Sequence, residues 1–265
     1  MTSVMAEGLR SWRARRRVSQ LELAVRAGTT QRHVSFIESG RSVPGRDMVI
    51  RLAESLQVPL RERNQLLVAG GYAPAYDETP YDSPDLGAIR RALTAILDGH
   101  RPSPALVVDR RADVVLTNSS FDALAAGVAP YLLEPPVSLP RLLLHPDGLA
   151  PRIVNLAEWS WHVIDGLTRE AALVPGLGVD ELIADLVTLI PPRPETGPDH
   201  VGFAVPLRLR SASGELRLVT TLTRFGTAID VTVSELRMEA FLPADEPTAR
   251  ALRGLDRTML QRVET

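Results

Sequence analysis

The sequence contains no cysteine and no lysine among its 265 residues. Without cysteine, the chain has no disulfide, no thiolate nucleophile and no zinc or iron–sulfur centre built on cysteine. The thirty basic residues are all arginine, which we interpret as a consequence of a GC-rich genome. No eighteen consecutive apolar residues occur, and no apolar segment follows the basic N-terminal stretch, so we expect neither a membrane span nor a secretory signal. The expected location is the cytoplasm.

The charge is divided unevenly along the chain. Residues 1–70 carry twelve arginines and six carboxylates, a net charge of +6, whereas residues 71–265 carry eighteen arginines and 26 carboxylates, a net charge of −8. A basic end on an acidic chain is the asymmetry expected when one end meets a polyanion. The hydrophobic fraction of 45% and the charged fraction of 23% are those of a globular protein. The length suits one large domain or two modest ones.

The N-terminal residues show helical patterns and no strand-like alternation. Ser19 and Glu22 form a capping-box pattern at the start of a helix that Gly28 ends. Thr29 and Thr30 are expected to cap the helix that follows. The sequence therefore predicts five short helices, over residues 7–17, 19–28, 31–39, 47–56 and 59–70.

A stretch rich in glycine and proline, with three tyrosines, follows these helices at residues 72–84. Composition and charge both change here, so we interpret the stretch as a linker between a helical domain over residues 1–71 and a second domain over residues 85–265. The alternative is a surface loop within one larger domain.

The second domain mixes helical and strand-like patterns. Alternation and short apolar runs predict strands, and 3.6-residue periodicity predicts helices between them. Two strands, a helical middle and three strands match a PAS-like α+β domain, in which helices cover one face of a five-stranded antiparallel sheet and leave a cavity. The alternative is an unrelated α+β domain with a filled core. The expected strands lie at residues 104–109, 113–117, 203–209, 215–225 and 236–242.

Residues 20–40 place two short amphipathic helices around a glycine turn. The run Gly-Thr-Thr-Gln at 28–31 and the ending Ile-Glu-x-Gly at 37–40 resemble the XRE family of phage-repressor-like regulators, and the resemblance extends over roughly residues 7–70. It implies a five-helix, lambda-repressor-like helix-turn-helix domain whose third helix enters the major groove of DNA.

The resemblance assigns base contacts to polar residues near the start of the third helix. Gln31 suits a bidentate contact with adenine, Arg32 suits guanine or a neighbouring phosphate, and Ser35 adds a weaker contact one turn later. Any one of these residues could instead be solvated helix surface, but their placement on one face favours DNA binding. The expected phosphate contacts are Gln20, Thr30, Arg41 and Arg46.

Members of the XRE family pair an arginine of the first helix with the glutamate at the end of the third helix. Arg13 and Glu38 occupy these positions in this chain. The resemblance therefore implies a partly buried ion pair with a structural role, and we expect no base contact from either residue.

The segments after the helical domain carry a second resemblance. Residues 67–74, the predicted strand pair ending at Asn118, and the stretches 225–227 and 241–245 are similar to regulators with an MmyB-like C-terminal domain. This resemblance implies a PAS-like ligand-binding domain, and fatty-acyl ligands have been proposed within that family.

The candidate pocket residues of the second domain are aromatic or apolar, with one histidine. Trp159 offers a large apolar wall, and the imidazole of His162 is suited to a carboxylate head group. The same residues would equally fill a dry core, but an apolar pocket with few polar groups suits a fatty acid better than a nucleotide. The predicted strand faces add Phe203, Val205, Leu207, Leu218 and Leu222.

The sequence shows no catalytic or nucleotide-binding motif, because G-x-S-x-G, H-E-x-x-H, P-loop and G-x-G-x-x-G patterns are all absent. The five histidines lack the spacing of metal ligands, so we expect no metal and no cofactor. We interpret the chain as a homodimeric transcription regulator that reads a two-fold operator in double-stranded DNA and binds a small apolar effector such as a fatty acid. Two alternatives stay open: a second domain that only dimerises or contacts proteins, and an enzyme with a regulatory DNA-binding head.

Overall fold

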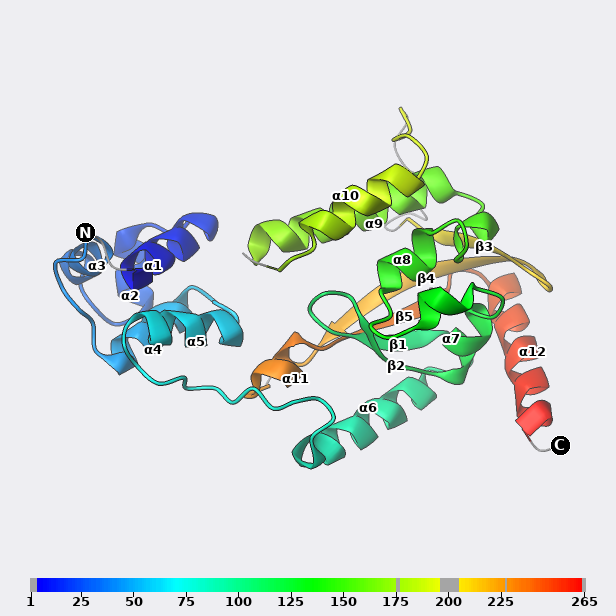
Figure 1. The fold of residues 1–265 in the computed structure, drawn as a ribbon, viewed down its shortest axis with the longest axis horizontal. Helices are drawn as coiled ribbons and strands as arrows, with labels where there is room; N and C mark the ends of the chain where they lie inside the picture. Colours follow the sequence, from blue (N-terminus) through cyan, green and yellow to red (C-terminus); the bar gives the residue numbers. More distant parts are fainter. Residues whose placement is uncertain (1–3, 175–176, 196–204, 227, 264–265) are drawn as a thin grey trace. The chain divides into compact units, whose positions relative to one another are not determined.

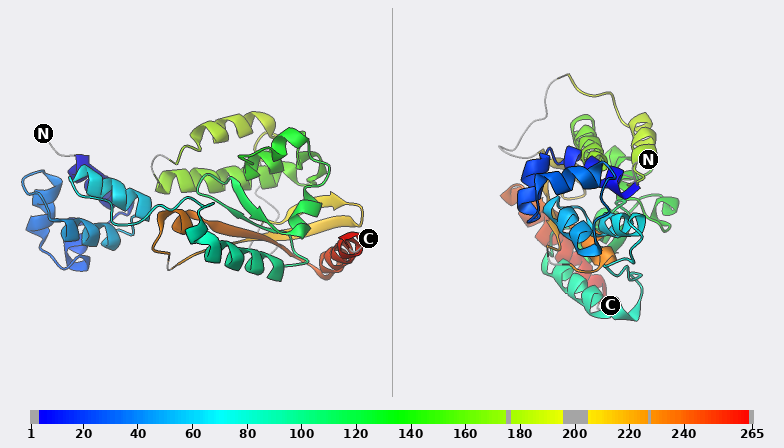
Figure 2. Two further views of the ribbon diagram at one scale, coloured as in Figure 1. Left: turned by 60° about the horizontal axis from the view of Figure 1, so that its bottom comes forward. Right: turned by 90° about the vertical axis from the view of Figure 1, so that its left-hand side faces the viewer.

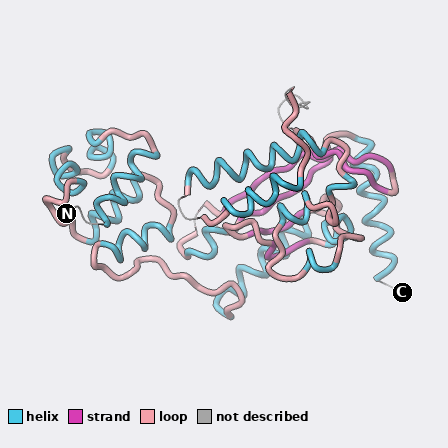
Figure 3. Tube along the Cα trace, turned by 45° about the horizontal axis from the view of Figure 1, so that its top comes forward, coloured by secondary structure: helices cyan, strands magenta, loops and turns pink. Residues whose placement is uncertain are grey.

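The computed structural model describes residues 4–174, 177–195, 205–226 and 228–263. Within these residues, strands occur only in the second of two compact units (Figures 1 and 3). The predicted order, a helical region followed by an α+β region, is confirmed. The two units comprise Met1–Ser83 with Phe225–Ser234, and Pro84–Arg224 with Glu235–Thr265.

Five helices form the first unit, and their apolar faces meet in one buried core. Two of them begin at the predicted caps: Ser19 Oγ accepts a hydrogen bond from Glu22 N at 3.1 Å, and Thr30 Oγ1 accepts one from His33 N at 3.2 Å. Gly28 has a φ of +63° and makes the left-handed turn between these two helices. The helices are α1 (Val4–Arg15), α2 (Gln20–Arg26), α3 (Gln31–Glu38), α4 (Arg46–Ser55) and α5 (Leu60–Ala69).

Residues 72–83, which the sequence assigns to a linker, belong to the first unit. Asn64 of α5 holds this segment, because its Oδ1 accepts hydrogen bonds from the backbone nitrogens of Ala75 and Tyr76 at 2.9 and 3.1 Å. Its Nδ2 donates to Tyr76 O at 2.7 Å. The segment therefore extends the helical unit rather than forming a free connection.

The second unit is built on a five-stranded antiparallel sheet with the strand order β2-β1-β5-β4-β3. Leu207 pairs with Leu218 and Leu209 with Leu216, so period-two alternation puts all four leucines on one buried face. Together with the helices between β2 and β3, this sheet forms the predicted PAS-like arrangement. The strands are β1 (Ala105–Val108), β2 (Val114–Thr117), β3 (Leu207–Ser211), β4 (Gly214–Arg224) and β5 (Arg237–Pro243).

Helices cover the sheet on both sides. Helices α8, α9 and α10 lie on one side and α6 lies on the other (Figures 1 and 2). Apolar residues from the first of these layers and from the sheet form one core. The α-helices that follow Ser83 in the chain are α6 (Gly87–Gly99), α7 (Ser119–Leu124), α8 (Leu139–Leu144), α9 (Leu156–Leu173), α10 (Asp180–Leu189), α11 (Val231–Glu235), most of which belongs to the first unit, and α12 (Glu246–Val263); three 3-10 turns are η1 (Pro84–Leu86), η2 (Pro130–Leu133) and η3 (Ala150–Arg152).

Helix α12 follows the last predicted strand, where no helix was expected. A local signal does begin this helix, because Asp245 Oδ1 accepts a hydrogen bond from Thr248 N at 2.8 Å. Thr248 Oγ1 accepts a second bond, from Arg217 N of β4 at 3.0 Å, and Leu252 is buried in the core. These contacts attach α12 to the sheet, and they join residues far apart in the sequence.

The β4–β5 connection, which we define as residues 225–234, leaves the sheet and belongs to the first unit. Within that unit, Val231 N donates to Asp77 O at 2.8 Å, and Asp230 Oδ2 accepts from Thr79 N at 3.1 Å. The connection between two adjacent strands of the second unit is therefore bonded to the segment that extends the helical unit.

Candidate functional site: an exposed helix and an amphipathic cavity

Helix α3 presents polar residues to solvent from a frame of buried apolar side chains. Val34 and Ile37 are each 1% exposed and pack in the core of the first unit. Gln31 and Arg32 are exposed, and Ser35, one turn after Gln31, is half-buried. The structure therefore brings the three predicted base-contacting residues together on the accessible side of one helix.

Phe36, which the sequence analysis does not single out, lies between two arginines. The Cζ atom of Arg32 is 5.1 Å from the centroid of the Phe36 ring, and that of Arg41 is 5.8 Å from it. At these distances the ring attracts both guanidinium groups and restricts their positions. An aromatic residue four positions after an arginine on an exposed helix is the signal that indicates such a contact.

The ion pair that the family resemblance implies is present. Arg13 Nε and Nη2 donate to Glu38 Oε1 and Oε2 at 2.6 and 2.9 Å, and the side chain of Glu38 is only 4% exposed. Burial opposes ionisation of Glu38, but hydrogen bonds from Arg13 and Gln20 outweigh it and lower the pKa of the carboxyl. The same pairing raises the pKa of Arg13.

Gln20 takes part in this pair through its Nε2, which donates to Glu38 Oε2 at 2.8 Å. A phosphate contact by Gln20 would therefore use its second amide hydrogen. The other expected phosphate contacts, Thr30, Arg41 and Arg46, are exposed. Thr30 caps α3 and Arg46 is the first residue of α4, so both are fixed close to helix ends.

A cavity of about 400 Å³ lies in the second unit, between one face of β4 and β5 and helices α8 and α9. This volume is in the range of small-molecule pockets. Alternate residues of the two strands face the cavity, because side chains along a strand point to opposite faces in turn. The strand residues in its wall are Thr220, Leu222, Arg224, Arg237, Glu239 and Phe241; the helices contribute Leu139, Pro140, Leu143, Trp159, His162, Val163, Gly166, Leu167, Arg169, Glu170 and Leu173.

One end of the strand pair in this wall is charged. Arg224 and Arg237 are opposite each other in register, and both pair with Glu170 of α9, Arg224 at 2.6 Å. Arg237 Nε also donates to Glu239 Oε1 at 3.2 Å. Burial raises the pKa of Glu239, and Arg237 opposes this shift only in part. The cavity therefore combines a mostly apolar wall with one cluster of paired charges.

Three of the predicted pocket residues line this cavity: Trp159, His162 and Leu222. Trp159 is 3% exposed and belongs to the core at the cavity wall. Leu222 is 59% exposed, although Leu216 and Leu218, on the same face of β4, are buried.

The other predicted pocket residues lie elsewhere. Val205, Leu207 and Leu218 are at most 7% exposed and fill the core instead of lining the cavity. Leu207 and Leu218 pair with each other where β3 lies beside β4, and both belong to the core that the sheet shares with its covering helices. Phe203 lies outside the described residues.

Within the described ranges, no group of three or more histidine, aspartate or glutamate side chains could hold a metal ion. No helix in the same ranges is long and apolar enough to cross a membrane.

Known proteins resemble the chain in two separate regions. Residues 9–63 match the family model "Helix-turn-helix", and residues 89–255 match "MmyB-like transcription regulator ligand binding domain". No curated protein matches the chain. The first match covers α2 and α3, and the second covers the whole sheet and the cavity.

A solved structure described as "Structure of an RNA-binding Light-Oxygen-Voltage Receptor" is similar at 15% identity and a TM-score of 0.28. The alignment covers 98% of this chain, which spans only 63% of the length of that structure. The ligand-binding-domain model covers more than half of the chain. The protein therefore belongs to the MmyB-like transcription regulators, with a DNA-binding helix-turn-helix domain followed by a ligand-binding domain.

Proposed function

We propose that this regulator acts as a homodimer on a two-fold operator, and that a fatty acid or a similar small amphipathic molecule in the cavity between α9 and the β4–β5 strand pair changes its affinity for DNA. The observation that carries the proposal is the cavity itself, with apolar walls and charged residues at one end of its strand pair. The effector and the dimer are the new elements; the DNA-binding and ligand-binding domains follow from the family.

The chemistry of the cavity wall supports a ligand with an apolar chain and a carboxylate. Leu143 and Trp159 provide apolar surface, and burying each methylene of a ligand contributes about 0.8 kcal/mol. Arg224, whose side chain is 65% exposed, is the accessible cation for a carboxylate. A nucleotide or sugar would leave most of its polar atoms unpaired against this wall.

The β4–β5 connection supports a route from ligand to DNA. Leu222 and Glu239 stand on the two strands that the connection joins, and both line the cavity. Asp230 in the connection is bonded to Thr79 of the helical unit. If β4 and β5 have two conformations and the ligand binds one of them more tightly, ligand binding shifts the strands, and the connection with them, toward that conformation.

The DNA-binding part is tested by selecting binding sites from random duplexes at several salt concentrations. We expect a two-fold site whose halves are about one helical turn apart, bound by two chains in a mass measurement of the complex. Arg32→Ala is expected to weaken binding by about 1–3 kcal/mol and to relax preference at one base position. A loss that is equal on every sequence would show that Arg32 contacts only phosphate.

The effector part is tested with Gly166→Leu. A Cβ atom built at Gly166, in the wall of the cavity, meets no atom within 4 Å. Leucine there takes up part of the cavity and favours the helix, so fatty-acid binding is expected to be lost while the fold is kept. Gly99→Leu is the control, because a Cβ atom built at Gly99 also meets no atom within 4 Å but Gly99 lies outside the cavity wall.

The measurement is lipid extraction and mass spectrometry of the purified protein, followed by titration with tetradecanoate and hexadecanoate. A stoichiometric lipid in the wild type and in Gly99→Leu, absent from Gly166→Leu, is the expected result. A wild-type protein that yields no lipid and binds neither fatty acid would contradict the proposal and favour a second domain that only dimerises or contacts proteins.

A further inference from the structure

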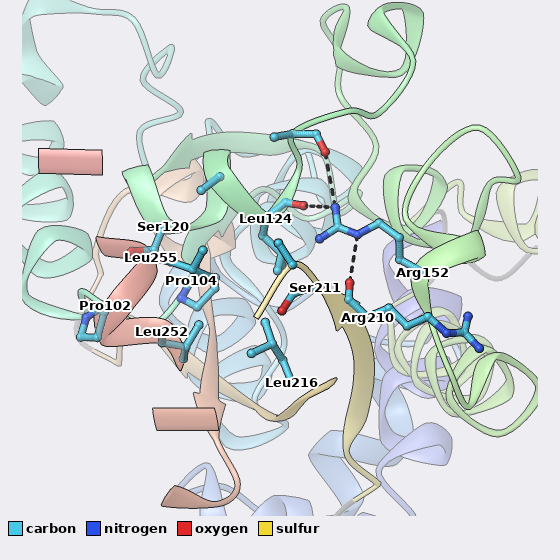
Figure 4. Close-up of a pocket in the computed structure, with 13 residues that line it drawn as sticks. Pro102, Pro104, Ser120, Leu124, Arg152, Arg210, Ser211, Leu216, Leu252 and Leu255 are labelled. Carbon is cyan, nitrogen blue, oxygen red and sulfur yellow. Dashed lines mark hydrogen bonds between the residues drawn. The ribbon is translucent and has the colours of Figure 1, made fainter. Parts of the chain in front are cut away.

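A second cavity, of about 450 Å³, lies in the same unit and shares no wall residue with the first. Its wall is formed by α7, η3, the β3–β4 turn and α12 (Figure 4). Most of the wall is apolar, with Pro104, Leu124, Leu216, Leu252 and Leu255 among its residues. This volume and this lining are those of a site for a small organic molecule.

Arg152 is the charged residue whose guanidinium faces this wall. Its Nη1 donates to Leu124 O at 2.8 Å and Ala126 O at 3.4 Å, and its Nε donates to Arg210 O at 3.3 Å. These three carbonyl contacts fix the plane of the guanidinium. In Figure 4 the third nitrogen, Nη2, has no hydrogen bond and points to the side on which Leu124 and Ser211 lie.

The charge of Arg152 has no counterion among the described residues. Other partly buried arginines do have one: Arg13 pairs with Glu38, and Arg237 pairs with Glu170. Burial without such a partner disfavours the charged form and lowers the pKa of Arg152. A partly buried cation with one free donor, beside an apolar cavity, is the arrangement that an anionic group would stabilise.

A second polar group in the wall is also unsatisfied. Ser120 is 9% exposed, and its Oγ has no hydrogen-bond partner in the described part of the chain. Buried hydroxyls normally have a partner, and this oxygen is closed off from the cavity, because less than 1 Å² of it is accessible. Arg152 Nη2, which has no hydrogen bond in the described part of the chain, is therefore the donor through which this wall would hold an anion.

We propose that this cavity is a second binding site, which takes a small monocarboxylate with an apolar body. The carboxylate accepts from Arg152 Nη2, and the apolar body packs against Leu124, Leu216 and Leu252. The proposal does not depend on an effector in the first cavity. Because Leu252 and Leu255 belong to α12, a bound carboxylate also stabilises the contact of this helix with the sheet.

A purely structural role for Arg152 is the competing explanation. Its bonds to Leu124 O and Ala126 O satisfy carbonyls at the C-terminal end of α7, as a capping arginine does. Such a role accounts for the bonds of Nη1 and Nε, with Nη2 solvated by water. It predicts that removal of Arg152 changes stability and that no carboxylate binds.

The probe is sodium octanoate, titrated calorimetrically into the full chain carrying Gly166→Leu, so that fatty-acid binding in the first cavity is blocked. We expect one molecule bound per chain, with 1-octanol, which lacks the charge, bound at least about tenfold more weakly. Arg152→Gln is expected to weaken octanoate binding by about 10- to 100-fold, the usual loss for a charge-assisted hydrogen bond. Absence of octanoate binding, or equal binding of octanol, overturns the proposal.

Arg210→Gln is the matched control for loss of an arginine. Arg210 also borders the cavity, but its guanidinium points away from it in Figure 4 and donates to Pro151 O at 3.3 Å. Octanoate affinity is expected to stay within about threefold of wild type in this variant. An equal loss in Arg152→Gln and Arg210→Gln would indicate general surface charge and overturn the assignment.

A second variant guards against a folding defect in Arg152→Gln. Ala123→Phe fills the cavity from α7 while Arg152 and its bonds to carbonyls are kept. Octanoate binding is expected to disappear in this variant at unchanged helix content by circular dichroism. Binding that persists in Ala123→Phe overturns the second site. If octanoate binds the wild type but not Gly166→Leu, the second site is also overturned, and the first cavity is then the fatty-acid site.

Discussion

Replacing Asn118 tests how the second unit is held together. This residue ends β2 and caps α7, and it is 2% exposed. Its Oδ1 accepts from Ala105 N and Phe121 N, and its Nδ2 donates to Leu97 O and Ser103 O, all at 3.0 Å. One side chain therefore joins α6, the loop before β1, β1 itself and α7.

The magnitude follows from which groups lose their last partner in Asn118→Ala. Phe121 N keeps a bond to the backbone oxygen of residue 118, and Leu97 O keeps one from His100 N. Ala105 N and Ser103 O have no other partner in the described structure. Two buried unpaired groups cost about 1–3 kcal/mol each, and the lost cap costs about 1 kcal/mol. Asn118→Ala is therefore expected to destabilise the second unit by about 3–7 kcal/mol.

The assay is urea unfolding followed by tryptophan fluorescence in a Trp12→Phe background, so that Trp159 and Trp161 report on the second unit alone. Ser119→Ala is the control, because Ser119 is adjacent and its buried Oγ has no hydrogen-bond partner among the described residues. Its effect is expected to be under about 1 kcal/mol. A decrease in the free energy of unfolding of less than about 1.5 kcal/mol for Asn118→Ala would refute the idea that its hydrogen bonds hold these four segments together.

Three further substitutions test the Phe36 contacts, the buried Glu38 ion pair and the β4–β5 connection. Phe36→Leu removes the ring between Arg32 and Arg41 and is expected to weaken operator binding about threefold to tenfold in an anisotropy titration; an unchanged affinity would contradict the positioning role. Glu38 has a lowered pKa, so the stability it provides is present at neutral pH and is lost as the pH falls through that pKa; thermal melts of Glu38→Gln should therefore depend less on pH below about 4.5, and an equally steep profile counts against the buried pair. Asp230→Ala is expected to leave fatty-acid affinity intact while reducing its effect on operator binding, and a full response in this variant would exclude the β4–β5 connection as the route.

Much of the helical unit could be predicted because its signals are local. Ser19 and Thr30 cap the helices whose starts they predict, and Gly28 has the positive φ that the turn requires. The family pattern also gave the Arg13–Glu38 pair. Helix caps and turns depend on residues a few positions apart, so one sequence carries enough information to place them.

The engagement of Gln20 and the role of Phe36 could not be derived in the same way. Gln20 bonds to Glu38, eighteen positions away, and Phe36 receives Arg41 from the loop beyond its helix. Both contacts depend on the angle at which helices meet, which periodicity does not specify. The side chains were visible in the sequence, but their partners were not.

The alternation of β4 by itself determined that Leu218 and Leu222 share one face of a sheet, and the order of strand and helix patterns determined a PAS-like domain behind a DNA-binding one. Only the tertiary structure decided that Leu218 is fully buried while Leu222 is 59% exposed at a cavity. It alone placed α12 and Arg152 around a second cavity. The physical reason is that alternation and capping are properties of neighbouring residues, whereas a cavity is the space that distant elements leave between them, and its volume depends on where each helix crosses the sheet.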